Sequence, residues 1–183
     1  MLTAKIDRAL IKSPVSSAEE LIESLKLSSH PEGGWYRRTF ESAILIDSKY
    51  GQRPLSSTIQ YLLKKGEVSR LHFLDADETW YFHEGAPLTI HLFHNNEYSS
   101  VVLGQCSGNP DFIAQFTIPA GTIFGAIPLK SAPKQFSLVS CSVTPGFTEG
   151  GFFWPDPDEL RKNFKKQSGL LEKFGIVGNL GGS

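Results

Sequence analysis

Two residues that could move a proton or bind a metal lie close together near the middle of the chain. His72 is followed six residues later by Glu78, and Gly85 follows after a further seven. Residues 69–74 and 78–84 both alternate apolar side chains, and a short acidic turn separates them, which predicts two strands joined by that turn. His72 and Glu78 would then face one cavity, where an imidazole is a natural partner for a buried carboxylate. The pair could act as a proton donor and acceptor or as two ligands of a metal.

Aromatic residues are expected beside this pair. Strand alternation places Trp80 and Phe82 on the same face as Glu78, and Phe124 comes from a later apolar segment. Such rings could stack on a sugar or a nucleobase, or they could simply fill the core. His83 has the opposite parity, which favours an outer-face or interface position over ligation.

Polar residues earlier in the chain are candidates for ligand binding. Glu32 lies in the block 30–34, whose paired glycines permit positive φ or close backbone approach, so it is either at the rim of a pocket or solvated in a helix-to-strand connection. Arg37 could clamp a phosphate or carboxylate if it points inward; Arg38 would then point outward, unless the register exchanges them. Gln60 is expected either to hydrogen-bond a ligand in the pocket or to lie on a strand edge.

These residues need a β framework, and the sequence predicts one between two helical segments. Residues 16–27 show helical periodicity with a capping box at Ser17 and Glu20, and residues 156–174 begin with an Asp-Pro-Asp-Glu run that is typical of a helix start. Many short strands at regular spacing favour an all-β fold whose antiparallel sheets close or pack together. The predicted strands are Trp35–Glu41, Ser57–Leu63, Ser69–Leu74, Glu78–Glu84, Leu88–Phe93, Ser99–Leu103, Phe112–Ile118, Ile123–Pro128 and Phe136–Val143.

Size and composition indicate one domain with a small-molecule ligand. The chain has 183 residues with 18 basic and 19 acidic side chains, so no basic field favours a nucleic acid polymer or an anionic membrane. A single domain over residues 1–183 is expected, with its core at about 30–150. No apolar run approaches the roughly 20 residues that span a bilayer, and the N-terminus lacks the apolar segment of a secretory signal. Together with Cys141, which is expected to be a buried reduced thiol, these features favour a cytoplasmic protein.

Several blocks occur in an order that resembles the cupin superfamily and, within it, the cupin 5 family. The resemblance covers about residues 20 to 150 and implies a double-stranded β-helix of the jelly-roll type. It also implies a homodimer and a pocket similar to that of the nucleotide-sugar epimerases of the superfamily. The blocks are HPEGGWYRRT (30–39), STIQYLL (57–63), GEVSRLH (66–72), DETWYFHEGAPL (77–88), PAG (119–121) and VTPGF (143–147).

The same resemblance bears on metal binding. Cupins hold a metal with two His and one Glu from a first motif and one His from a second motif, and here Leu74 and Phe124 stand at two of these four positions. The family shares the apolar residue at Leu74, whereas Phe124 departs from the polar residue expected there. With only His72 and Glu78 left, the chain could bind a divalent metal weakly, and no redox centre is expected.

Three functions are compatible with these residues. An isomerase or epimerase acting on a sugar or nucleotide-sugar would use His72 as the base, Glu78 to orient it and Tyr61 as a possible acid. A non-catalytic module would use the same barrel as a sensor or carrier pocket. An enzyme with a weakly bound divalent metal on His72 and Glu78 is the third hypothesis, and the first two are preferred to it.

Overall fold

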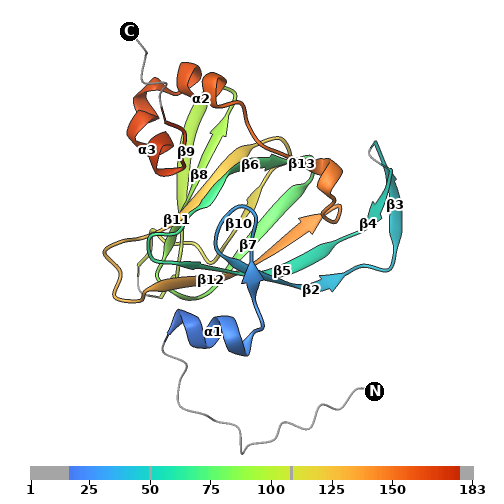
Figure 1. The fold of residues 1–183 in the computed structure, drawn as a ribbon, viewed down its shortest axis with the longest axis horizontal. Helices are drawn as coiled ribbons and strands as arrows, with labels where there is room; N and C mark the ends of the chain where they lie inside the picture. The colour runs from blue at the N-terminus through green and yellow to red at the C-terminus, as the bar shows by residue number, and fades with distance from the viewer. Residues whose placement is uncertain (1–16, 50, 108, 178–183) are drawn as a thin grey trace, which may run out of the picture.

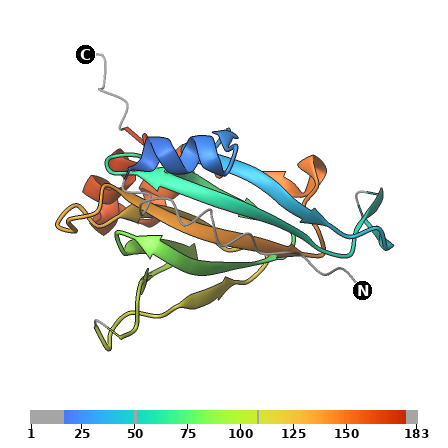
Figure 2. The same ribbon diagram turned by 90° about the horizontal axis from the view of Figure 1, so that it is seen from below.

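The computed structural model describes residues 17–49, 51–107 and 109–177, which build two antiparallel sheets packed face to face (Figures 1 and 2). The first sheet has six strands in the order β1-β2-β5-β12-β7-β10, namely β1 (Ser28–Ser29), β2 (Trp35–Glu41), β5 (Ser57–Lys64), β12 (Phe136–Thr144), β7 (Asp77–Gly85) and β10 (Gln115–Ile118). The second has five in the order β13-β6-β11-β8-β9, namely β13 (Phe152–Phe153), β6 (Ser69–Leu74), β11 (Ile123–Pro128), β8 (Leu88–His94) and β9 (Glu97–Leu103). The predicted all-β jelly roll with a helix at each end is confirmed.

The two sheets enclose the main core. Every second side chain along each strand points into the space between the sheets, and these side chains form the core. Tyr61, Trp80 and Val139 from the six-stranded sheet meet Ile90 and Phe124 from the five-stranded one, and all five are almost fully buried. The part of each inner face that forms this cluster is therefore apolar. A polar side chain that enters this space needs a partner inside it.

A helical segment flanks each end of the described chain. Helix α1 (Ala18–Ser24) begins at Ser17, and the predicted capping box is present, because Ser17 and Glu20 bond each other's backbone N–H. The helix packs on the outer side of the six-stranded sheet. The predicted C-terminal helix is divided into α2 (Pro157–Asn163), the 3-10 turn η3 (Lys165–Gln167) and α3 (Ser168–Lys173). Residues 1–16 and 178–183, which belong to the predicted single domain, lie outside the described residues.

The sequence did not predict the hairpin β3 (Leu45–Ser48) and β4 (Gly51–Pro54), which projects beyond the two sheets in Figure 1. Its base is fixed by Arg53, whose guanidinium donates to Asp75 Oδ1 at 2.9 Å and to the carbonyl oxygens of Gly146 and Pro145 at 2.7 and 3.1 Å. The Asp75 N–H in turn donates to the Gly151 carbonyl at 3.0 Å. These bonds hold the segment 145–151 against the ends of the sheets.

Candidate functional site

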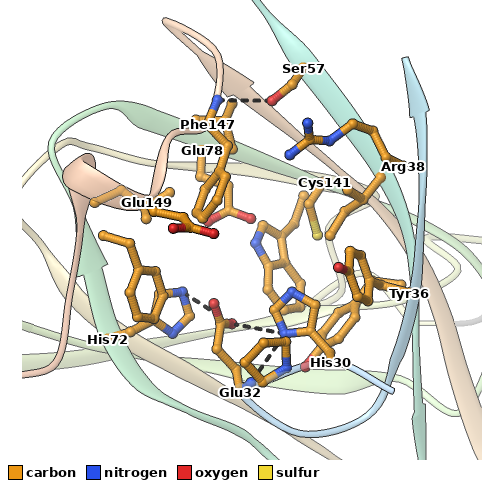
Figure 3. Close-up of a pocket in the computed structure, with 17 residues that line it drawn as sticks. His30, Glu32, Tyr36, Arg38, Ser57, His72, Glu78, Cys141, Phe147 and Glu149 are labelled. Atoms are coloured by element: carbon orange, nitrogen blue, oxygen red, sulfur yellow. Dashed lines mark hydrogen bonds and ion pairs between the residues drawn. The ribbon is translucent and has the colours of Figure 1, made fainter. Parts of the chain in front are cut away.

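A cavity of about 310 Å³ opens between the two sheets, and the predicted pair His72 and Glu78 both line it (Figure 3). The inner faces of β2, β5, β7 and β12 form one side, and β6 forms another. The loop 30–32 and the segment 147–152, which lie far apart in the sequence, complete the wall. The cavity therefore depends on segments that flank the strand framework as well as on the strands.

The loop 30–34 carries Glu32 into the cavity because its two glycines let the backbone approach neighbouring strands closely. Gly33 and Gly34 have φ of 107° and 73°, and a Cβ on Gly33 would lie 2.3 Å from the Val68 carbonyl oxygen. The Arg70 N–H donates to the Glu32 carbonyl at 2.9 Å, which ties the loop to β6. Glu32, which the sequence left as either a rim residue or a solvated one, is therefore buried at 8% exposure.

His72 is held in one orientation and contacts Glu32. Its Nδ1 lies 2.7 Å from the Arg70 carbonyl oxygen. Because a carbonyl only accepts hydrogen bonds, Nδ1 carries the proton and Nε2 of the neutral ring is an acceptor. Nε2 lies 3.4 Å from Glu32 Oε2 (Figure 3). Phe124 and Phe152 pack on the ring, with centroids 4.3 and 5.3 Å away, and keep water from it.

Burial favours the neutral forms of Glu32, His72 and His30. It raises the pKa of Glu32 to about 8, an effect that a hydrogen bond from Ser69 at 3.3 Å and the charge of Arg70 only partly oppose. Burial also lowers the pKa of His72, against the opposing influence of Glu78, and lowers the pKa of His30 to about 4. At neutral pH the cluster is thus mainly a neutral carboxyl beside neutral imidazoles.

Glu78 enters from the other side of the view in Figure 3, on strand β7. Burial raises its pKa to about 7; His72, Trp80 and Cys141 lower it, whereas the charge of Glu32 raises it further. The Trp80 indole nitrogen has no hydrogen-bond partner among the described residues, although the indole lies near enough to Glu78 to affect its protonation. Cys141 is a buried free thiol, as predicted.

The predicted acid Tyr61 lines the cavity, but its hydroxyl is engaged. The phenol donates to the Gly33 carbonyl oxygen at 2.7 Å, and burial raises its pKa well above the ordinary value. Its proton is therefore directed at the loop and not at a ligand. The expectation that Tyr61 supplies the acid is not supported by this geometry.

Four further residues that were expected at the site are not on the cavity lining. Arg37 and Gln60 do not line the cavity; the two side chains bond each other at 3.2 Å on the exposed outer face of the sheet. Phe82 and Phe124 are core residues behind the cavity wall and are not on its lining. The expected inward direction of Arg37 is wrong because β2 turns its even-numbered residues, Tyr36 and Arg38, toward the cavity.

The cavity is also bordered by Arg38, which the sequence placed inward only if the register exchanged it with Arg37, and by Glu149, which the sequence did not single out. Arg38 reaches it from β2 and pairs with Glu41, and Glu149 reaches it from the segment 147–152 (Figure 3). The Ser57 hydroxyl accepts the Phe147 N–H at 2.9 Å and so fixes that segment to β5. The aromatic and glycine-rich run after residue 146 is the sequence signal that could have predicted a role for this segment.

The donor set does not fit a metal centre of the cupin type. Leu74 lines the cavity and Phe124 lies behind it, at two of the positions where cupins place ligands. Among the described residues, no group of three or more His, Cys, Asp or Glu side chains is arranged to hold an ion. His72 Nε2 is also directed at Glu32. We therefore derive no chemistry through a metal.

A double-stranded β-helix with this buried histidine and carboxyl site defines a member of the cupin superfamily. The chain matches the family described as cupin 5, or DUF985, over residues 19–153, and it belongs to that family. It is similar to a hypothetical protein from Leishmania major, with 31% identity and a TM-score of 0.77 over 86% of this chain and 98% of that one. It is also similar to a protein from Shewanella oneidensis, with 36% identity and a TM-score of 0.78 over 87% and 98% of the two chains.

More distant similarity concerns the fold alone. CapF, solved with the inhibitor 3-isopropenyl-tropolone, shares 11% identity and a TM-score of 0.51 over 71% of this chain and 33% of its own. No curated protein matches the chain. None of the helices in the described part is long and apolar enough to cross a bilayer.

Proposed function

We propose that the protein binds a small polar molecule in the cavity and isomerises or epimerises it, with a sugar or nucleotide-sugar as the substrate class. The observation that carries this proposal is the contact of 3.4 Å between His72 Nε2 and Glu32 Oε2, inside a cavity that Glu78 enters from another side. Such a reaction needs one group to remove a proton next to a carbonyl and another to donate one.

The raised carboxyl pKa values suit these two roles. With a pKa of about 7, Glu78 is partly ionised at neutral pH and can accept the proton of the carbon next to the carbonyl. With a pKa of about 8, Glu32 is mostly protonated and can donate to the carbonyl oxygen. The electrons of the broken C–H bond form the double bond of an enediol, and the protons return in the reverse sense to give the isomer. His72 is a positioning residue that holds Glu32 and can exchange a proton with it.

Solvent exchange tests this proposal. The protein would be incubated in deuterium oxide with a panel of ketoses and keto-sugar nucleotides, and deuterium at the carbon next to the carbonyl would be measured by NMR. We expect Glu78→Gln to reduce the rate of exchange by about 100-fold, a typical contribution of a general acid–base group. The matched control is His83→Gln on the same strand, because His83 lies on the outer face and bonds Ser140 at 2.6 Å. Undiminished exchange in Glu78→Gln would exclude the assigned chemistry.

A non-catalytic binding module is the alternative function, and one observation favours it. Glu32, His72, Ser69 and Tyr61 already bond or contact groups within the protein, which stiffens the site. A sensor or carrier would show a rise in Tm with ligand and no exchange of deuterium. Detectable turnover by the same sample would exclude it.

We also propose that the chain forms a homodimer in the cytoplasm. Phe40, Ile44, Leu45 and Leu55 are between 41% and 62% exposed, on or beside the projecting hairpin. In the described residues β1 pairs only with the first two residues of β2, so the rest of that edge has no neighbouring strand. Light scattering should give twice the mass of the chain, and Ile44→Glu together with Leu45→Glu should give monomers. A monomeric wild-type protein would refute the dimer.

The proposed cytoplasmic location rests on the two cysteine thiols. Cys106 and Cys141 are both free, as in proteins of a reducing compartment. Localisation of a tagged full-length chain would test this part of the proposal.

A further inference from the structure

The cavity carries more carboxyl groups than fixed cations. Glu32, Glu78 and Glu149 line it, and among the described residues Arg38 is the one Arg or Lys on its wall. The Arg38 guanidinium is already paired with Glu41. An anionic ligand would therefore meet three carboxyl groups and a cation that has a partner, which argues against the phosphate or carboxylate clamp expected from the sequence.

Glu78 is a buried carboxyl without a cationic partner. The residue is only 7% exposed, and no described Lys, Arg or His nitrogen lies within ion-pair distance of its carboxyl oxygens. Its neighbours are the Trp80 indole and the Cys141 thiol, neither of which is positively charged. Ionising a buried carboxyl costs free energy unless a positive charge is supplied close by. A cationic ligand in this cavity would supply that charge.

Aromatic rings in the lining of the same cavity suit a positive charge as well. Tyr36, Tyr61, Trp80, Phe147 and Phe152 all line the cavity. The faces of aromatic rings attract cations, and the attraction is larger when water is excluded. Carboxyl groups and rings around one enclosed space are the two features by which proteins recognise organic ammonium groups.

We infer that the ligand of this cavity carries an organic ammonium group, which lies beside Glu78 and the aromatic rings of the lining. This inference rests on the proposed function for the location of the site, and it narrows the substrate class to amine-bearing carbonyl compounds, of which amino sugars are the sugar members. An ammonium group would be the partner that Glu78 lacks within the protein.

Binding of a cation beside Glu78 should also release a proton. A bound cation favours the ionised form of Glu78, whose pKa is about 7 in the free protein, so binding lowers that pKa and releases a proton near neutral pH. Affinity for the cation therefore rises as the pH increases through about 7. The other titratable groups that interact with Glu78 are Glu32, His72, Tyr61 and Cys141; Glu32 adds to the effect, because its pKa of about 8 falls as well.

Two matched pairs of probes test the inference by calorimetry on the full-length protein. Choline and 3,3-dimethyl-1-butanol share one shape and differ in charge, and D-glucosamine and D-glucose differ by one amino group. We expect at least one charged probe to bind about tenfold or more tightly than its neutral counterpart, as a charge-assisted contact provides. Choline itself does not titrate. Its heat of binding should therefore depend on the ionisation enthalpy of the buffer, because the protein releases a proton to the buffer when choline binds.

The variant Glu78→Gln should remove the preference and bring each pair to within about threefold. The control Glu84→Gln lies on the same strand with an exposed side chain, and it should keep the preference. If Glu78→Gln does not fold, the buffer dependence of choline binding to the wild-type protein still decides the question. Equal binding within both pairs, or no binding by either charged probe, would overturn the inference.

Failure of the inference and failure of the proposed function give different results. Deuterium exchange without a preference for cations would leave the isomerase intact and remove the ammonium ligand. A preference for cations without exchange would support the ligand and leave the binding module as the function.

Discussion

Replacing Glu32 by Gln should make the folded protein less sensitive to alkaline pH. The pKa of Glu32 is about 8 in the folded chain, whereas the ordinary value is 4.5. A group whose folded pKa is raised in this way favours folding while it is protonated, and the contribution is lost as the pH rises from 4.5 to about 8. Each tenfold change in proton affinity corresponds to about 1.4 kcal/mol, so the whole loss is about 5 kcal/mol.

Between about pH 5.5 and about pH 9, the free energy of unfolding should fall by roughly 3 kcal/mol of this total. The rest is already lost at the lower pH, because the carboxyl of the unfolded chain is mostly ionised there. Gln has the shape of the protonated carboxyl and no charge to desolvate, so this loss should be absent from the variant. The Glu78 pKa should fall in the same variant, because the Glu32 charge raises it, and this change acts in the same direction.

Urea unfolding of the wild-type protein and Glu32→Gln at the two pH values gives the free energies of unfolding directly. The matched control is Glu84→Gln, which replaces an exposed carboxyl on β7 and should follow the wild-type protein. The same fall in stability for Glu32→Gln as for the wild-type protein would refute the argument, because it would mean that Glu32 is not buried as an uncharged acid.

Two further predictions concern the segments that border the site. Gly33→Ala should destabilise the fold by several kcal/mol, because a Cβ there would lie 2.3 Å from a backbone oxygen; Gly66→Ala, also at positive φ but with no atom within 4 Å, should cost about 1 kcal/mol. Thermal unfolding of both variants tests this, and equal shifts in Tm would contradict it. Arg53→Met should cost about 3–5 kcal/mol because it leaves Asp75 without its partner, whereas Arg161→Met breaks an exposed pair and should cost less than about 1 kcal/mol. Urea unfolding checks this pair, and a small loss in Arg53→Met would show that the hairpin base does not hold segment 145–151.

The strand framework could be predicted from the sequence because alternation and turn residues are local signals. Strands β2, β6 and β11 have the predicted bounds, and the inward parity of His72 and Glu78 is correct. The hairpin β3–β4 could not be predicted in this way, since its two short strands bury little apolar surface and its one fully buried side chain is an arginine, Arg53.

The errors at the site arise from contacts between distant segments. Alternation on β2 could not decide between Arg37 and Arg38, because the strand begins with Trp35 and Tyr36, which are aromatic on both faces. Helix α1 covers Trp35, and the cavity takes Tyr36. The contact of Glu32 with His72 depends on how a loop folds onto a strand about 40 residues later, and no local pattern carries that information.

Parts of the cavity wall come from segments far apart in the sequence, since residues 30–32 supply one part and residues 147–152 another. A ribosome releases them far apart in time, so a nascent chain can pair most of its strands before the last wall exists. Competence to hold a ligand is therefore acquired only once residues 147–152 have been synthesised, and any fragment that stops before residue 147 should lack it even if most of its strands have already paired.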